Sequence, residues 1–150
     1  MLTDEQLTAL RDDILADPVL AAYPMSPDGA FAIKEAYNLL AVPDFIVWRT
    51  AVPVSEIINN GFIWTAVDVL EPGKARIWDW MRESGVINPS KPNVRQGLQD
   101  AFGGSQTNIT KHLKRPATRA EKLLAIPGAT NTMTFEGFLG YTDIEQARAL

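Results

Sequence analysis

Proline and glycine are spread along the whole chain, and together with charged residues they interrupt each of its apolar runs. Pro18, Pro43 and Pro53 each end or divide a segment with helical spacing, because proline inside a helix removes a backbone hydrogen bond. Gly85 and the glycine pair at 103–104 supply stop signals for two later segments. We therefore expect short helices, and no window reaches the roughly 18 consecutive apolar residues of a membrane span.

The composition sets the class of protein. The 150 residues are 46% hydrophobic, which is enough for a buried core, and the length fits one domain more naturally than two. There is no cysteine, so disulfides, thiolate nucleophiles and cysteine-ligated metals are excluded. The acidic N-terminus MLTDEQLTALRDD differs from a secretory signal, which begins with basic residues. We expect a soluble protein of the cytoplasm with no membrane partner.

Helix starts are the clearest local signals. Three capping boxes place a threonine three residues before a Glu or Gln whose side chain can reach back to the threonine amide. They are Thr3–Gln6, Thr118–Glu121 and Thr142–Glu145. Ser26-Pro27 offers a fourth start, with proline in the first turn of the helix. It is followed on one face by Ala30, Ile33, Tyr37 and Leu40.

The middle of the chain is less regular. We interpret PDFIVWRTAVPVSEIINNG, residues 43–61, as two short helices, because Pro53 forbids an unbroken one. In KARIWDWMRESG, residues 74–85, apolar side chains cover more than half of the helix circumference, so this helix is expected to be buried in the core or against another subunit. A further helix is expected to open at 90–93 and to close at the glycine pair.

The pattern changes after Pro127-Gly128. Residues 132–136 alternate with period two, and Gly137 and Gly140 bracket Phe138-Leu139, which is typical of an extended segment. The predicted fold is mainly α, a helical bundle of about five to seven helices with an extended C-terminal arm or short β segment. We divide it into a helical body, 1–126, and an arm, 127–150, with a short terminal helix.

The stretch KHLKRPATRAEK, residues 111–122, holds five of the fourteen Lys and Arg residues and the only histidine, although the chain carries a formal charge of -4. Apolar residues keep helical spacing from 109 to 124, so this region is either one kinked helix or two helices that share an apolar side. The basic side chains are expected on the solvent side of that helix. They are Lys111, Lys114, Arg115, Arg119 and Lys122.

No residue pattern predicts a catalytic, cofactor or metal site. The two hydroxyl residues nearest to His112 in sequence are threonines, and neither of them occupies a nucleophile elbow. Asp12 and Asp13 point in different directions on a helix, so they make a poor acid–base pair. FGGSQT, residues 102–107, lacks the lysine of a phosphate-binding loop. We therefore expect a protein that is not an enzyme.

Five stretches together carry a resemblance to a known family. They are FIVWRTAVPVSEI, KARIWDWM, INPSKPNVRQGL, KRPATRAEKLLA and MTFEGFLGYTDIEQARAL. Over nearly its whole length the chain resembles a family of small virion proteins of tailed bacteriophages and prophages. The resemblance implies a structural part of the virion, a head-to-tail adaptor of the neck, assembled in the host cytoplasm. It implies no catalytic residue.

The resemblance also implies partners. Adaptors of this kind are helical bundles that form rings, commonly of twelve subunits, in contact with the portal protein and with tail or neck proteins, close to packaged DNA. A ring needs complementary patches on each subunit. The acidic N-terminal helix and the five basic residues of 111–122 are candidates for one such pair. A docking arm would use Phe135, Phe138, Leu139 and Tyr141.

Two alternatives remain open at this point. A tail-completion or tail-terminator ring differs from a portal-side adaptor only in its neighbours. A small DNA-binding packaging accessory protein is the other, because a basic stripe can contact phosphates even in an acidic chain. No helix-turn-helix, zinc-finger or aromatic stacking motif accompanies the basic residues, so sequence-specific DNA recognition is not expected.

Overall fold

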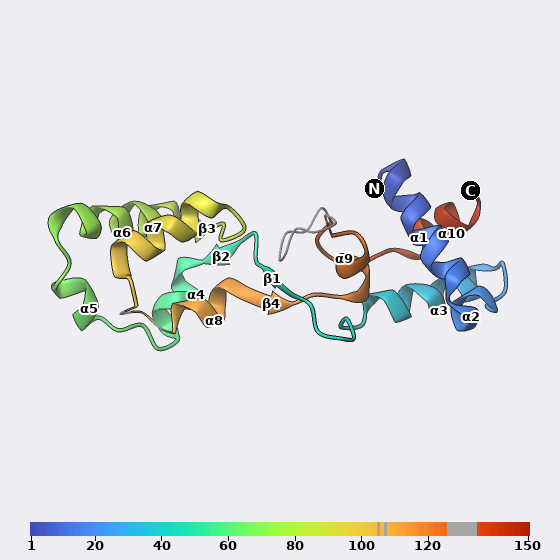
Figure 1. Ribbon diagram of the computed structural model, residues 1–150, viewed down its shortest axis with the longest axis horizontal. Coiled ribbons are helices and arrows are strands. Elements are labelled where there is room, and N and C mark those ends of the chain that lie inside the picture. Colours follow the sequence, from blue (N-terminus) through green and yellow to red (C-terminus); the bar gives the residue numbers. More distant parts are fainter. Residues whose placement is uncertain (105, 107, 126–134) are drawn as a thin grey trace. The chain divides into compact units, whose positions relative to one another are not determined.

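The computed structural model describes residues 1–104, 106, 108–125 and 135–150, which form ten helices and four short strands (Figure 1). The mainly α class is therefore confirmed, with two small sheets in addition. The described helices outnumber the five to seven expected, because several are one turn long. The short ones are α2 (Pro18–Ala21), α5 (Thr65–Asp68), α8 (Ile109–Leu113) and α9 (Arg119–Leu123).

The chain divides into two compact units. Unit 1 consists of Met1–Ile46 and Pro116–Leu150, and unit 2 consists of Val47–Arg115. Each unit has its own cluster of buried apolar side chains. This division differs from the expected body of 1–126 and arm of 127–150, because the last helix packs into the same core as the first. Pro127-Gly128 and positions 132–134 of the expected arm lie outside the described residues.

Unit 1 is built around three longer helices. They are α1 (Asp4–Ala16), α3 (Pro27–Asn38) and α10 (Tyr141–Arg148). Helix α10 packs against both α1 and α3 (Figure 1). Their apolar faces supply the fully buried Leu10, Ile14, Ile33, Tyr37 and Ile144. The two ends of the sequence therefore stabilise one another in a shared core.

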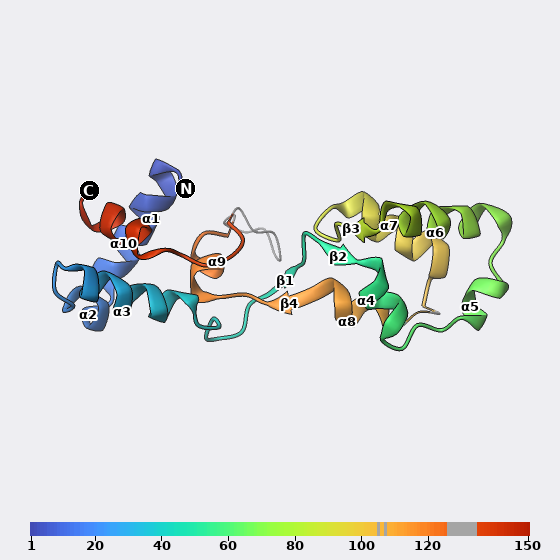
Figure 2. The ribbon, with the colours of Figure 1, turned by 180° about the vertical axis from the view of Figure 1, so that it is seen from behind.

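Unit 2 is built around a helix pair and an aromatic cluster. Helices α6 (Pro72–Ser84) and α7 (Pro92–Phe102) lie side by side in both views (Figures 1 and 2). The Trp78 ring stacks on Phe62 at 5.1 Å and meets Phe102 edge-on at 5.2 Å. Short strands β2 (Val52–Pro53) and β3 (Val86–Ile87) pair antiparallel beside helix α4 (Val54–Asn59).

Two expected helical stretches are extended instead. Strand β1 (Ile46–Trp48) occupies the first half of the region that we interpreted as two helices, and strand β4 (Lys114–Pro116) separates α8 from α9. The two strands pair in one small sheet. Ile, Val and Trp favour strands, and Pro116 cannot donate a helical hydrogen bond. Two helices within 109–124 are therefore confirmed, and the kinked single helix is wrong. The two helices do not share an apolar side, because Ile109 and Leu113 pack in the core of unit 2 whereas Ala120 and Leu124 pack in that of unit 1.

Helix starts follow the capping boxes in two of three cases. Thr3 accepts a hydrogen bond from the Gln6 amide while Gln6 accepts one from the Thr3 amide, and Thr118 and Glu121 do the same. The third box is displaced: α10 begins at Tyr141, and the Gly140 amide donates to the Asp143 carboxylate at 2.8 Å. Over the described ranges, no helix is long and apolar enough to cross a membrane.

Candidate interaction surfaces

Charge is divided unequally between the two units. Unit 1 holds five Lys and Arg against twelve Asp and Glu, a formal charge of -7. Unit 2 holds nine against six, a formal charge of +3, and the two values add up to the -4 of the whole chain. The boundary falls inside the basic stretch of 111–122, so its five cations do not lie on one helix face. Lys111, Lys114 and Arg115 belong to unit 2, and Arg119 and Lys122 belong to unit 1.

Arg119 is engaged within its own unit. Its guanidinium donates to Asp13 at 2.9 Å and to Asp17 at 3.1 Å, both on or next to α1. It also lies 4.7 Å from the centre of the Tyr37 ring, and the Tyr37 hydroxyl donates to Asp13 at 2.5 Å. The acidic helix and this basic residue, which we expected to pair between copies, therefore pair inside one chain.

The other basic residues have different surroundings. Lys122 Nζ donates to the carbonyl of Pro43 at 3.0 Å. In unit 2, Lys114 Nζ and the Arg95 guanidinium lie 4.2 Å and 4.8 Å from the centre of the Trp48 ring, which is cation–π geometry. Arg115 is half-buried in β4, and Lys111 is exposed on α8.

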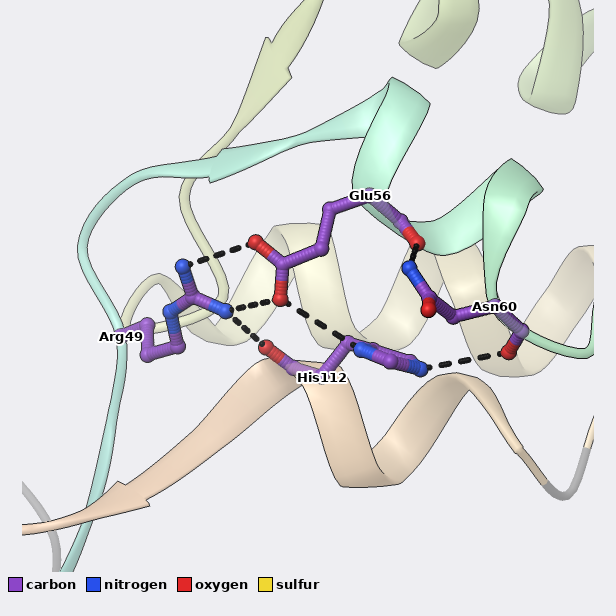
Figure 3. A network of polar contacts seen from close by, with 4 residues as sticks. All are labelled: Arg49, Glu56, Asn60 and His112. Carbon is purple, nitrogen blue, oxygen red and sulfur yellow. Dashed lines mark hydrogen bonds and ion pairs between the residues drawn. The ribbon is translucent and has the colours of Figure 1, made fainter.

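His112 belongs to a polar network that joins three segments of unit 2 (Figure 3). Arg49 forms a bidentate ion pair with Glu56, with N–O distances of 2.6 and 3.0 Å, and also donates to the carbonyl of His112. The His112 ring lies 3.4 Å from Glu56 Oε1 and 3.3 Å from the Asn60 carbonyl. The Arg49 hydrogen bonds lower the pKa of Glu56, with a smaller contribution from His112. These contacts tie the end of β1 to α4 and α8, which is a structural role.

The four residues of the expected docking arm differ in burial. Leu139 is 2% exposed, and Phe135 is partly buried against the core of unit 1. The Asn38 side chain both donates to and accepts from the backbone of Leu139, at 3.1 and 2.9 Å. Phe138 and Tyr141 are 74% and 49% exposed. Of these four residues, Phe138 and Tyr141 therefore offer the larger exposed surface to a partner.

The buried carboxylate of Glu121 holds the same segment. Beyond its capping bond to Thr118, it accepts a hydrogen bond from the Gly137 amide at 2.9 Å. Its capping role was predictable, but the contact to Gly137 was not, because the two residues are sixteen positions apart. The chain before α10 is therefore fixed to α9 and to α3.

An exposed apolar segment, residues 39–42, was missed at the sequence level. Leu39, Leu40 and Val42 are 67%, 60% and 90% exposed, whereas Ala41 is buried. Together with Arg119 and Lys122 they line a hollow of about 630 Å³. We had assigned Leu40 to the apolar face of α3, but this helix ends at Asn38.

A second apolar surface, the α6–α7 groove, lies in unit 2. It measures about 520 Å³. Its apolar lining consists of Ile77, Trp80, Met81, Val86, Ile87, Val94 and Gly97. The expected burial of the α6 apolar face holds for Trp78, which is 2% exposed, but Trp80 is 62% exposed. Two positions along a helix turn the side chain by about 200°, so one core cannot bury both tryptophans.

The chain matches no protein-family model, no curated protein and no solved structure. Within the described parts of the chain, no three His, Asp or Glu side chains come together as a group that could hold a metal ion.

Proposed function

We propose that this chain is a structural protein of a tailed-bacteriophage particle, which forms a ring at the head-to-tail junction. The family resemblance of five sequence stretches motivates the proposal. In this role the chain would bind copies of itself and neighbouring virion proteins through apolar surfaces. No reacting group is needed for such a role, only rigid surfaces of defined shape.

One observation carries the proposal: large apolar side chains stand exposed on both units, around well-packed cores. Leu39, Leu40 and Val42 are at least 60% exposed in unit 1, and Trp80 is 62% exposed at the α6–α7 groove of unit 2. Exposed apolar side chains that are grouped together, as in segment 39–42 and in the α6–α7 groove, are typical of surfaces that associate with protein. By contrast, the polar network around His112 joins protein segments to one another.

Deletion of the gene for this chain from a phage genome tests the proposal. We expect its deletion to leave DNA-filled heads and separate tails, with infectious particles restored when the wild-type chain is supplied from a plasmid. A portal-side adaptor and a tail-completion ring are then distinguished by the fraction that binds added protein, the heads or the tails. Normal yields of infectious, tailed particles after deletion would contradict the proposal.

DNA binding by unit 2 is a second candidate, favoured by its charge of +3. The cations Arg95 and Lys114 lie around Trp48, and Lys111 is exposed nearby in sequence. Contacts of this kind to phosphates would weaken steeply as salt rises. Lys111→Glu should reduce salt-dependent DNA binding by the full chain if this candidate is right, whereas Lys34→Glu in unit 1 should not. Absence of DNA binding at low salt would reject it.

A further inference from the structure

The charge division between the units favours one mode of self-association. Contact between two copies through unit 1 would bring together surfaces of formal charge -7, which repel. Contact of unit 1 with unit 2 of the next copy brings together -7 and +3, which attract. A two-fold pair must use the same patch on both copies, whereas a head-to-tail contact uses two different patches. The charges thus favour contact of unit 1 with unit 2 over contact between like units.

Segment 39–42 has the properties of a preformed ligand. The Ala41 amide donates to the Ala117 carbonyl at 3.0 Å, and the Leu39 carbonyl accepts from the Arg119 amide at 2.9 Å. Ala41 is buried, so this backbone is held while the neighbouring side chains remain in water. A segment already ordered before binding loses little conformational entropy when it binds.

The α6–α7 groove has the properties of a receptor for such a segment. Trp80 stands at its wall, and tryptophan is enriched among the residues that dominate binding energy. Beside Gly97 the space is filled by the Met81 side chain, whose terminal methyl would lie 2.7 Å from a Cβ at position 97. The apolar lining suits the apolar side chains of segment 39–42.

The margins of the two surfaces carry opposite charge. Among the described residues that line the α6–α7 groove, Asp100 is the only charged one. Lys122 lines the hollow beside segment 39–42, where Arg119 is already paired with Asp13 and Asp17. A lysine on one copy and an aspartate on the next would fix the register of the contact more than its strength.

We propose that the α6–α7 groove of one copy binds segment 39–42 of a second copy, so that copies join unit 2 to unit 1, head to tail. This inference rests on the proposed ring and names the two surfaces that would close it. A stable interface buries roughly 800 Å² on each partner, so these two surfaces would form its apolar centre.

Sedimentation of the full chain at increasing concentration tests this contact. We expect wild-type protein to form oligomers, and Trp80→Ser and Leu40→Ser to weaken their association at least tenfold. Two matched controls change exposed apolar residues elsewhere: Val69→Ser in unit 2 and Leu15→Ser in unit 1, which are 80% and 66% exposed. Both controls should associate like wild type. Because all four side chains are exposed, the circular dichroism and melting temperature should stay unchanged.

A mixing experiment tests whether the groove of one copy binds segment 39–42 of another. Trp80→Ser keeps an intact segment 39–42, and Leu40→Ser keeps an intact groove. Each variant alone should be monomeric, whereas their equimolar mixture should form a species with the mass of two copies and no larger one. If the mixture stays monomeric, or if either variant assembles alone, the proposed contact is wrong.

Failure of this inference can be told apart from failure of the proposed function. Oligomers of the wild type that survive both substitutions would overturn the named surfaces and leave a ring through other surfaces in place. A wild type that stays monomeric at every concentration would also overturn the inference. The deletion experiment on phage particles tests the ring independently of either result.

Discussion

At the scale of single residues, the charged and polar side chains that the sequence singled out mostly form contacts within the chain. The basic stretch of 111–122 invited an interpretation as a partner surface, yet Arg119 bridges Asp13 and Asp17 and covers the Tyr37 ring. His112, the only histidine, contacts Glu56 and the Asn60 backbone. Sequence spacing could not predict these pairs, because Asp13 and Arg119 are 106 positions apart.

Tyr37→Phe should lower the free energy of unfolding by about 2 kcal/mol at pH 7, because the buried hydroxyl donates to an ionised carboxylate. Burial, followed by the nearby Asp13, raises the pKa of Tyr37 above its ordinary value. A raised pKa in the folded state gives stability below the unfolded pKa of about 10, which is lost as the pH rises further. Urea unfolding at pH 7 and above pH ~10 checks this, since the difference from wild type should shrink in alkali. An equal difference at both pH values would contradict the role of the hydroxyl.

Glu56→Gln should destabilise unit 2 by about 1 kcal/mol at neutral pH, because it removes the ion pair with Arg49. The pKa of Glu56 is lowered in the folded state, so its contribution is present above the ordinary value of 4.5 and is lost as the pH falls below it. Thermal unfolding at pH 7 and at pH ~3 measures the effect. Glu83→Gln, at an exposed position on α6, is the control and should match wild type at both pH values.

At the scale of elements, helix starts were predictable where the signal is local. The capping boxes at Thr3 and Thr118 and the Ser26-Pro27 start need only side chains within one turn, and all three are observed. Strands β1 and β4 were missed because they pair across more than sixty intervening residues. Trp80 and segment 39–42 were missed because exposure depends on where neighbouring elements pack.

The segment before α10 offers a test with adjacent residues. Leu139→Ala should cost about 3 kcal/mol of unfolding free energy, because its side chain is 2% exposed in the core of unit 1. Phe138→Ala, at a position 74% exposed, should change stability by less than about 0.5 kcal/mol. Denaturant titration of both variants decides this. Equal costs for the two would show that the segment is not held as described.

At the scale of the whole molecule, two separate cores replace the one expected from length. All three tyrosines, Tyr23, Tyr37 and Tyr141, lie in unit 1, and all four tryptophans lie in unit 2. The same division gives the units opposite formal charge. Neither property could be seen in the sequence, because unit 1 is made from both ends of the chain and its boundary cuts the basic stretch.

Destabilising one core should therefore leave the other in place. Ile33→Ala removes a fully buried side chain from unit 1 and should lower its stability by about 3 kcal/mol. Fluorine NMR of fluorotyrosine and fluorotryptophan follows the two units separately during urea unfolding. We expect the tyrosine midpoint to shift and the tryptophan midpoint to stay. A common shift of both midpoints would mean that the units unfold as one.

The central claim that we propose is that this chain acts by binding copies of itself within a virus particle. Cryo-electron microscopy of purified particles from a phage that encodes the chain tests that claim most directly. We expect a ring of copies between head and tail, with unit 2 of each copy against unit 1 of the next. Purified, infectious particles that contain no copy of the chain would contradict it.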